Sequence, residues 1–135
     1  MMQNTREIIE LYYQHFNQAD MNNMLALLDD QIEHDVNQGE RQTGKKLFAS
    51  FMDRMNRCYK EQVHHINIMV NHDGTRAAAE FIVDGSYLVT DNDLPAANGQ
   101  QYSIPCGAFF EVHQGKITRV TNYYNLNAWL KQVGA

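Results

Sequence analysis

The sequence predicts an α+β domain, a curved antiparallel sheet with N-terminal helices packed on its concave face. Two observations predict this fold class. Residues 5–58 show mainly helical periodicity, whereas residues 62–124 alternate as long strands joined by tight turns. Helices segregated in this way from hairpin-connected strands are typical of α+β proteins and not of parallel α/β proteins.

The first helical segment opens with a capping signal. Asn4 is followed three residues later by Glu7, as in a capping box, and apolar residues then recur at helical spacing to predict a helix over residues 5–19. Asp20 is placed to cap a second, shorter helix that we expect to end near residues 29–30. The two helices would form a hairpin.

A short strand follows this hairpin. Apolar and polar residues alternate over 32–37, and a turn at 38–40 ends the strand. Helical spacing of apolar residues then predicts a third helix over 43–58. Because successive side chains of a strand point to opposite faces, His34 and Asp35 are expected on opposite sides of the sheet.

Four long strands and a last helix complete the chain. Hairpin turns are predicted at 72–75 and 114–115, and between them lies a loop over 90–100 that is a candidate lid or dimer contact. Gly85, inside a strand, predicts a bulge or sharp bend that would curl the sheet around a cavity. A final helix carries the single tryptophan, Trp129. The strands are expected over 63–71, 76–89, 102–113 and 117–124.

Composition excludes several classes of function. The 135 residues fit one domain, 1–135, and no run approaches the roughly 18 apolar residues of a membrane span, so no membrane partner is expected. A net charge of -5 with scattered Lys and Arg gives no basic stripe, which argues against nucleic-acid binding. With no secretory signal and no C-x-x-C motif around Cys58 or Cys106, we expect a cytoplasmic protein with reduced thiols.

Short motifs along nearly the whole chain resemble those of one known family. In this order and spacing they resemble a ketosteroid-isomerase-related, SnoaL-like protein of the nuclear transport factor two-like superfamily. The resemblance implies a cone of sheet and helices, open at one end, and a homodimer formed across the sheet. The motifs are Leu27-Leu28-Asp29-Asp30, His34-Asp35, Gly44 nine residues after that aspartate, and Gly115-Lys116-Ile117.

The resemblance also implies a proton-transfer site. Tyr12 and Asp35 fall where ketosteroid isomerase has its oxygen-binding tyrosine and its basic aspartate. Inside an apolar cone the pKa of Asp35 would be raised, but a one-residue slip of the strand would turn Asp35 to solvent. Gly107 stands where that enzyme has a second oxyanion acid, so this donor is missing. A solvated strand-end acid and a packed core tyrosine are the alternative interpretations.

Two classes of function remain open for such a pocket. An isomerase- or cyclase-like enzyme would move a proton next to a carbonyl of a hydrophobic substrate, with Asp35 as base and Tyr12 as donor. A non-catalytic module would hold an apolar ligand, and the fold also suits a dehydratase or hydrolase. No organic or metal cofactor is expected, and His64 and His65 should face opposite ways. The expected pocket lining is Phe16, Phe51, Met55, His65, Tyr87, Cys106, Asn122 and Tyr124.

Overall fold

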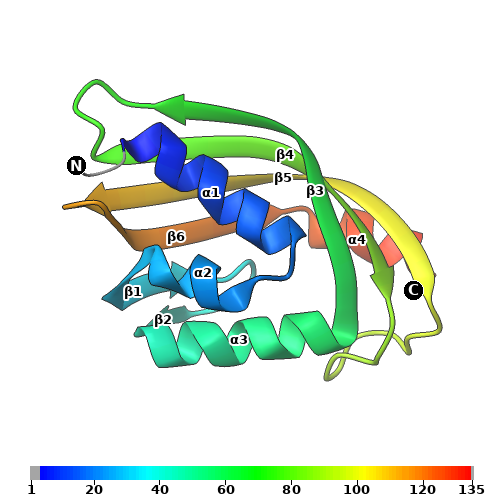
Figure 1. Cartoon of the computed structure of the whole chain (residues 1–135). Helices are drawn as coiled ribbons and strands as arrows, with labels where there is room; N and C mark the ends of the chain where they lie inside the picture. The colour runs from blue at the N-terminus through cyan, green and yellow to red at the C-terminus, as the bar shows by residue number, and fades with distance from the viewer. Residues whose placement is uncertain (1–3, 135) are drawn as a thin grey trace.

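A curved sheet and the helices on it make up the described residues, 4–134, of a computed structural model. Figure 1 shows α1, α2 and α3 lying over one face of the sheet, as predicted for this α+β fold. The elements are α1 (Thr5–Asn17), α2 (Met21–Ala26), β1 (Leu28–Asp35), β2 (Arg41–Thr43), α3 (Lys45–Cys58), β3 (Tyr59–Val70), β4 (Arg76–Tyr87), β5 (Gln100–His113), β6 (Lys116–Tyr124) and α4 (Leu126–Gln132).

The strand order in the sheet is β2-β1-β6-β5-β4-β3. The two predicted hairpins pair antiparallel, β3 with β4 and β5 with β6. The pair β1 and β6 is parallel, which the expectation of a wholly antiparallel sheet missed. These two strands are joined through α3 and three long strands, and such a long connection does not impose the direction that a tight hairpin imposes.

The capping signals are confirmed at both N-terminal helices. The Asn4 side chain accepts a hydrogen bond of 2.9 Å from the backbone N–H of Glu7, and Asp20 accepts one of 3.3 Å from Asn23. The expected end of the second helix near residues 29–30 is wrong, because β1 already starts at Leu28. This residue is fully buried and pairs with Ile117, so packing against β6 overrides the helical pattern.

Gly85 makes room for a tyrosine, and the bulge predicted there is wrong. The register through Gly85 is continuous, with Glu61 of β3 on one side and Tyr102 of β5 on the other. A Cβ atom at Gly85 would lie 2.3 Å from Cζ of Tyr102, so the glycine lets this ring cross over β4. The bulge lies in β3, just after His64, where His65 takes the left-handed φ of 54°.

Replacing Gly85 with alanine tests this close approach. Because the new methyl group overlaps the Tyr102 ring, Gly85→Ala should lower the free energy of unfolding by about 1–3 kcal/mol, measured by urea denaturation. The matched control is Gly107→Ala, where the nearest atom to an added Cβ is 3.8 Å away, and it should stay within about 0.5 kcal/mol of wild type. In a Tyr102→Ala background the Gly85→Ala cost should disappear. Equal effects of the two single alanines would contradict the steric account.

Candidate functional site

A cavity of about 350 Å³ lies between the helices and the concave face of the sheet. Its walls are mainly aromatic and aliphatic, which suits an apolar small molecule. Trp129 of α4 also lines it. Of the residues proposed from the sequence, those that line the cavity are Tyr12, Phe16, Phe51, Met55, Cys106, Asn122 and Tyr124.

Two residues expected in the lining lie elsewhere. Tyr87 is fully buried outside the cavity lining, stacked on Tyr59 with ring centroids 5.3 Å apart and edge-on to Trp129. His65 is exposed at the β3 bulge, and its Nδ1 lies 2.5 Å from Nδ1 of His64. The expectation that these two imidazoles face opposite ways is therefore wrong, because the bulge breaks the alternation of the strand.

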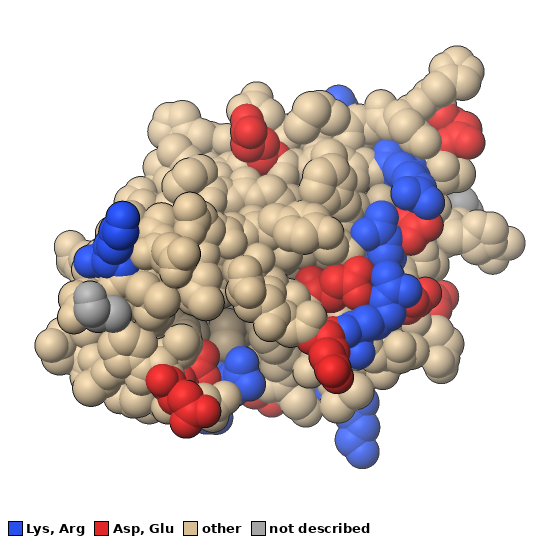
Figure 2. Space-filling view, turned by 180° about the vertical axis from the view of Figure 1, so that it is seen from behind, with Lys and Arg blue, Asp and Glu red and all other residues tan. Residues whose placement is uncertain are grey.

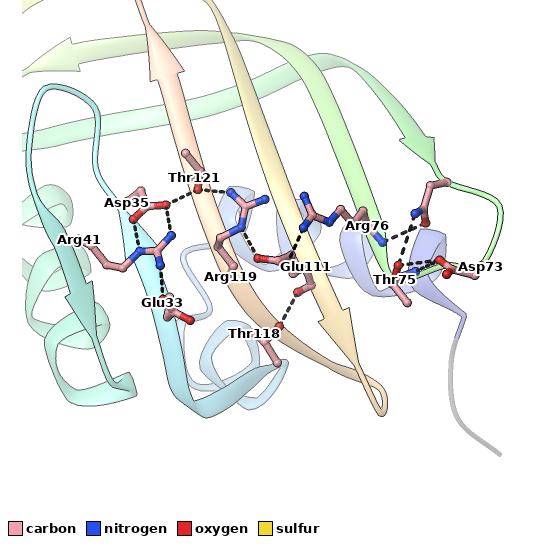
Figure 3. A network of polar contacts seen from close by, with 11 residues as sticks. Glu33, Asp35, Arg41, Asp73, Thr75, Arg76, Glu111, Thr118, Arg119 and Thr121 are labelled. Carbon is pink, nitrogen blue, oxygen red and sulfur yellow. Dashed lines mark hydrogen bonds and ion pairs between the residues drawn. The ribbon is translucent and has the colours of Figure 1, made fainter.

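Asp35 faces away from the cavity, on the outer face of the sheet (Figure 3). Arg41 holds its carboxylate with contacts of 2.7 and 3.0 Å, and the Thr121 hydroxyl donates a third hydrogen bond of 2.6 Å. The bond from Arg41 is the main cause of an Asp35 pKa lowered to about 2. The raised pKa expected for this residue is wrong, because the alternation of β1 turns Asp35 outward.

His34, the neighbour of Asp35, is the residue that β1 presents to the cavity. Its ring lies between Phe48 and Phe51, with centroids 4.6 and 4.8 Å away. Burial lowers the pKa of His34 to about 4, while the charge of Asp35 acts in the opposite direction. The imidazole is therefore neutral at pH 7, with one nitrogen that donates and one that accepts a hydrogen bond.

Glu61 is the acidic group that sequence reasoning missed. It lines the cavity, and the Tyr102 hydroxyl reaches across Gly85 to donate a hydrogen bond of 2.5 Å to its Oε2. Burial raises the pKa of Glu61, and the bond from Tyr102 opposes that rise. The predicted strand starts at Val63, whereas β3 begins at Tyr59. The continuation of the β-strand alternation toward the helix end was the signal that could have found Glu61.

A thiol completes this part of the cavity. Cys106 is a free cysteine, as is Cys58. Burial, with a further contribution from the Glu61 charge, raises the pKa of the Cys106 thiol to about 12. A thiol with such a pKa stays protonated near neutral pH and is a poor nucleophile.

The loop between β4 and β5 forms another part of the wall. Asp91 of this loop is buried, and it accepts a hydrogen bond of 2.8 Å from the Tyr59 hydroxyl. The guanidinium of Arg54, on α3, lies 3.2 Å from its second oxygen. The Tyr87 hydroxyl ties the same loop down by donating to the carbonyl of Pro95 at 2.7 Å. These contacts hold the loop against α3 and β3.

Within residues 4–134, no group of three or more His, Cys, Asp or Glu side chains is arranged to hold a metal ion. In the same part of the chain, no helix has the length and apolarity needed to cross a membrane.

The family profile described as a SnoaL-like domain matches residues 9–120. A solved structure from Pseudomonas putida, described as a candidate polyketide cyclase, is 57% identical, with 98% of this chain and 99% of that chain covered and a TM-score of 0.97. A protein of the same description from Xanthomonas campestris is 50% identical over 96% of both chains, with a TM-score of 0.94. A search of the curated proteins gave no match.

A more distant structure shares the fold alone. This is an epoxide hydrolase from M. tuberculosis, 18% identical over 96% of this chain and 88% of that chain, with a TM-score of 0.74. Proteins with this fold therefore carry different activities, so the chemistry of this chain has to be argued from its own side chains.

Titration of Asp35 tests its assignment to the outer face. The folded pKa of about 2 lies below the ordinary aspartate pKa of 3.8, so Asp35 stabilises the fold above about pH 4 and this contribution is lost as the pH falls through about 2. Because the pair with Arg41 is partly exposed, Asp35→Asn should cost at most about 1 kcal/mol at pH 7, measured by urea denaturation. The matched control is Asp53→Asn, at an exposed acid of α3. An NMR titration that placed the pKa of Asp35 above 3.8 would contradict this assignment.

Proposed function

The chain belongs to the SnoaL-like family of the nuclear transport factor two-like superfamily, and from this premise we propose that it is an enzyme acting on a hydrophobic carbonyl compound. The proposed reaction is proton transfer next to the carbonyl group, as in a cyclase or an isomerase. The observation that carries the proposal is the Glu61 carboxyl group, which lines an apolar cavity with its pKa raised. The candidate polyketide cyclases that resemble this chain support the same class of reaction.

Glu61 takes the role of base that the sequence suggested for Asp35. Its Oε2 accepts the bond from Tyr102, whereas Oε1 has no hydrogen bond from the described residues. In the proposed step, ionised Glu61 removes a proton from the carbon next to the carbonyl, and the electron pair of that C–H bond forms an enolate. A raised pKa brings Glu61 closer to the working pH, where it can both accept and return a proton.

Two outcomes then follow from the enolate. If Glu61 returns its proton to another carbon of the conjugated system, the reaction is an isomerisation. If the enolate carbon attacks a second carbonyl of the same molecule, a ring closes, and the proton on Glu61 passes to the oxygen of that second carbonyl. Both sequences leave Glu61 ionised and need no oxidant or reductant.

Tyr12 is the proposed donor to the enolate oxygen. Tyr12 lines the cavity, and its hydroxyl has no hydrogen bond from the described residues. Burial raises the pKa of this phenol, so it stays protonated and acts as a donor. A donor placed where negative charge develops stabilises the transition state more than the ground state.

We also propose that two copies of the chain pair through the outer face of the sheet. Phe109 and Tyr123 lie next to each other there, with ring centroids 5.9 Å apart and exposed fractions of 47% and 57%. Figure 2 shows an uncharged area in the middle of this face, with a band of charged side chains along one side of it. An exposed apolar patch rimmed by charges is typical of a protein interface.

The role of Glu61 is tested by proton exchange on a panel of ketones in D₂O, followed by NMR. Wild-type exchange should rise with pH through the pKa of Glu61, since only the ionised form accepts a proton. Glu61→Gln should slow exchange by about 10²–10⁴-fold while keeping the fold. In wild type the hydrogen bond from Tyr102 lowers the pKa of Glu61, so Tyr102→Phe, which removes this bond, should raise that pKa and move the rise in exchange to higher pH. Glu80→Gln, at an exposed acid of β4, is the control. Exchange by Glu61→Gln at the wild-type rate would remove Glu61 from the mechanism.

The pairing of two copies is tested by sedimentation at micromolar concentration. Wild type should sediment with the mass of two chains, and Phe109→Lys should sediment as one chain because it places a charge in the middle of the apolar patch. Leu47→Lys is the matched control, since Leu47 is comparably exposed but lies on α3. A single-chain mass for wild type would contradict the proposal.

A further inference from the structure

Two polar atoms buried at the cavity wall have no hydrogen-bond or ion-pair partner among residues 4–134. They are the hydroxyl of Tyr13 and Nδ1 of His34, in residues that are 4% and 2% exposed. Buried polar groups are nearly always hydrogen-bonded, because an unpaired one loses its interaction with water and gains nothing in return. Both residues line the cavity, so a molecule bound there is the candidate for the missing partner.

Aromatic neighbours hold the ring of His34 in place, but they do not hydrogen-bond its nitrogen atoms. Phe48 and Phe51 contact the imidazole through their aromatic faces and edges and offer no hydrogen bond. Because the ring is neutral at pH 7, it can donate to a carbonyl oxygen or accept from a hydroxyl group. A replacement by phenylalanine would keep these aromatic contacts and remove the polar atoms alone.

Tyr13 presents its hydroxyl from a different part of the wall. Its ring packs against Tyr12, Phe81 and Phe110, with centroids 5.2, 4.9 and 6.1 Å away, and all of these partners lie on α1, β4 or β5. His34 instead belongs to the wall formed by β1 and α3. Figure 1 shows α1 and α3 as separate helices over different parts of the sheet. The two unpaired atoms therefore belong to different elements of the cavity wall, Tyr13 to α1 and His34 to β1.

We propose that His34 and Tyr13 determine specificity by each hydrogen-bonding an oxygen atom of the ligand. The ligand would then be an apolar molecule that carries carbonyl or hydroxyl oxygens at two separated positions. This inference deepens the proposed function, and it is distinct from the roles of Glu61 and Tyr12 because it concerns which molecule is held and not the proton that moves. A ligand without these oxygens leaves both buried atoms unpaired, so the site discriminates against it.

The test measures binding by equilibrium dialysis with three probes of one skeleton: 2,6-dihydroxynaphthalene, 2-naphthol and naphthalene. Each variant is compared with wild type for the same probe, which cancels the hydration of the probe itself. Both His34→Phe and Tyr13→Phe should weaken binding of the dihydroxy probe by about tenfold and leave naphthalene within about twofold of wild type. His113→Phe, at an exposed histidine ending β5, should change neither affinity.

Stability of the ligand-free protein gives an independent readout. Because the Tyr13 hydroxyl has no partner to lose, Tyr13→Phe should unfold at or above the wild-type temperature. Tyr59→Phe should unfold at a lower temperature, since it removes the bond to Asp91. If Tyr13→Phe and His34→Phe bind the dihydroxy probe as wild type does, water satisfies the two atoms and the inference is wrong.

Failure of this inference and failure of the proposed enzyme give different results. Loss of the dihydroxy preference in both variants, together with no proton exchange by wild type, would leave a binding protein with the specificity inferred for it. Exchange that depends on Glu61, together with an unchanged preference in both variants, would keep the enzyme and overturn the roles of His34 and Tyr13.

Discussion

The parallel pairing of β1 with β6 is the constraint on which the site depends. It buries Leu28 against Ile117 and sets Asp35 opposite Thr121. With this register, the alternation of the strand turns His34 into the cavity. It turns Asp35 to the outer face, where Arg41 binds its carboxylate. A shift by one residue would place a carboxylate in the cavity and an imidazole on the outer face, so the chemistry available to the cavity is decided by strand pairing.

The cavity contains buried polar groups of two kinds. The carboxyl groups of Glu61 and Asp91 are each held by a tyrosine hydroxyl, and Asp91 also by Arg54. Such bonds fix the position of a group and oppose the cost of burying it. The Tyr13 hydroxyl and Nδ1 of His34 have no such bonds among the described residues, so burying these two atoms costs stability in the free protein. Groups of the first kind are positioned for chemistry or for holding a loop, and groups of the second kind are available to a ligand.

Much of the fold was predictable because its signals are local. The Asn4 cap and the two hairpin turns need only neighbouring residues, and these elements are confirmed. The parallel β1 and β6 pair joins residues about ninety positions apart, and no local pattern reports it. Of the site, most of the aromatic lining was predictable from periodicity. Glu61 was not, because its importance comes from a tyrosine that crosses a glycine on the neighbouring strand.

The proposed proton transfer from substrate to Glu61 does not need a positively charged side chain in the cavity. Arg54 is the one Lys or Arg among the described lining residues, and it is paired with Asp91. A cation is therefore not free to stabilise an enolate. None is needed, because removal of a proton from a neutral substrate by ionised Glu61 moves one negative charge and creates no new one. The charge passes from a carboxylate bonded by the Tyr102 phenol to an enolate oxygen bonded by a second phenol, and the apolar walls of the cavity strengthen both bonds. In the proposed reaction, the bond from Tyr102 stabilises the carboxylate before the transfer and the second phenol stabilises the enolate after it, while the raised pKa of Glu61 reduces the energy cost of removing the proton.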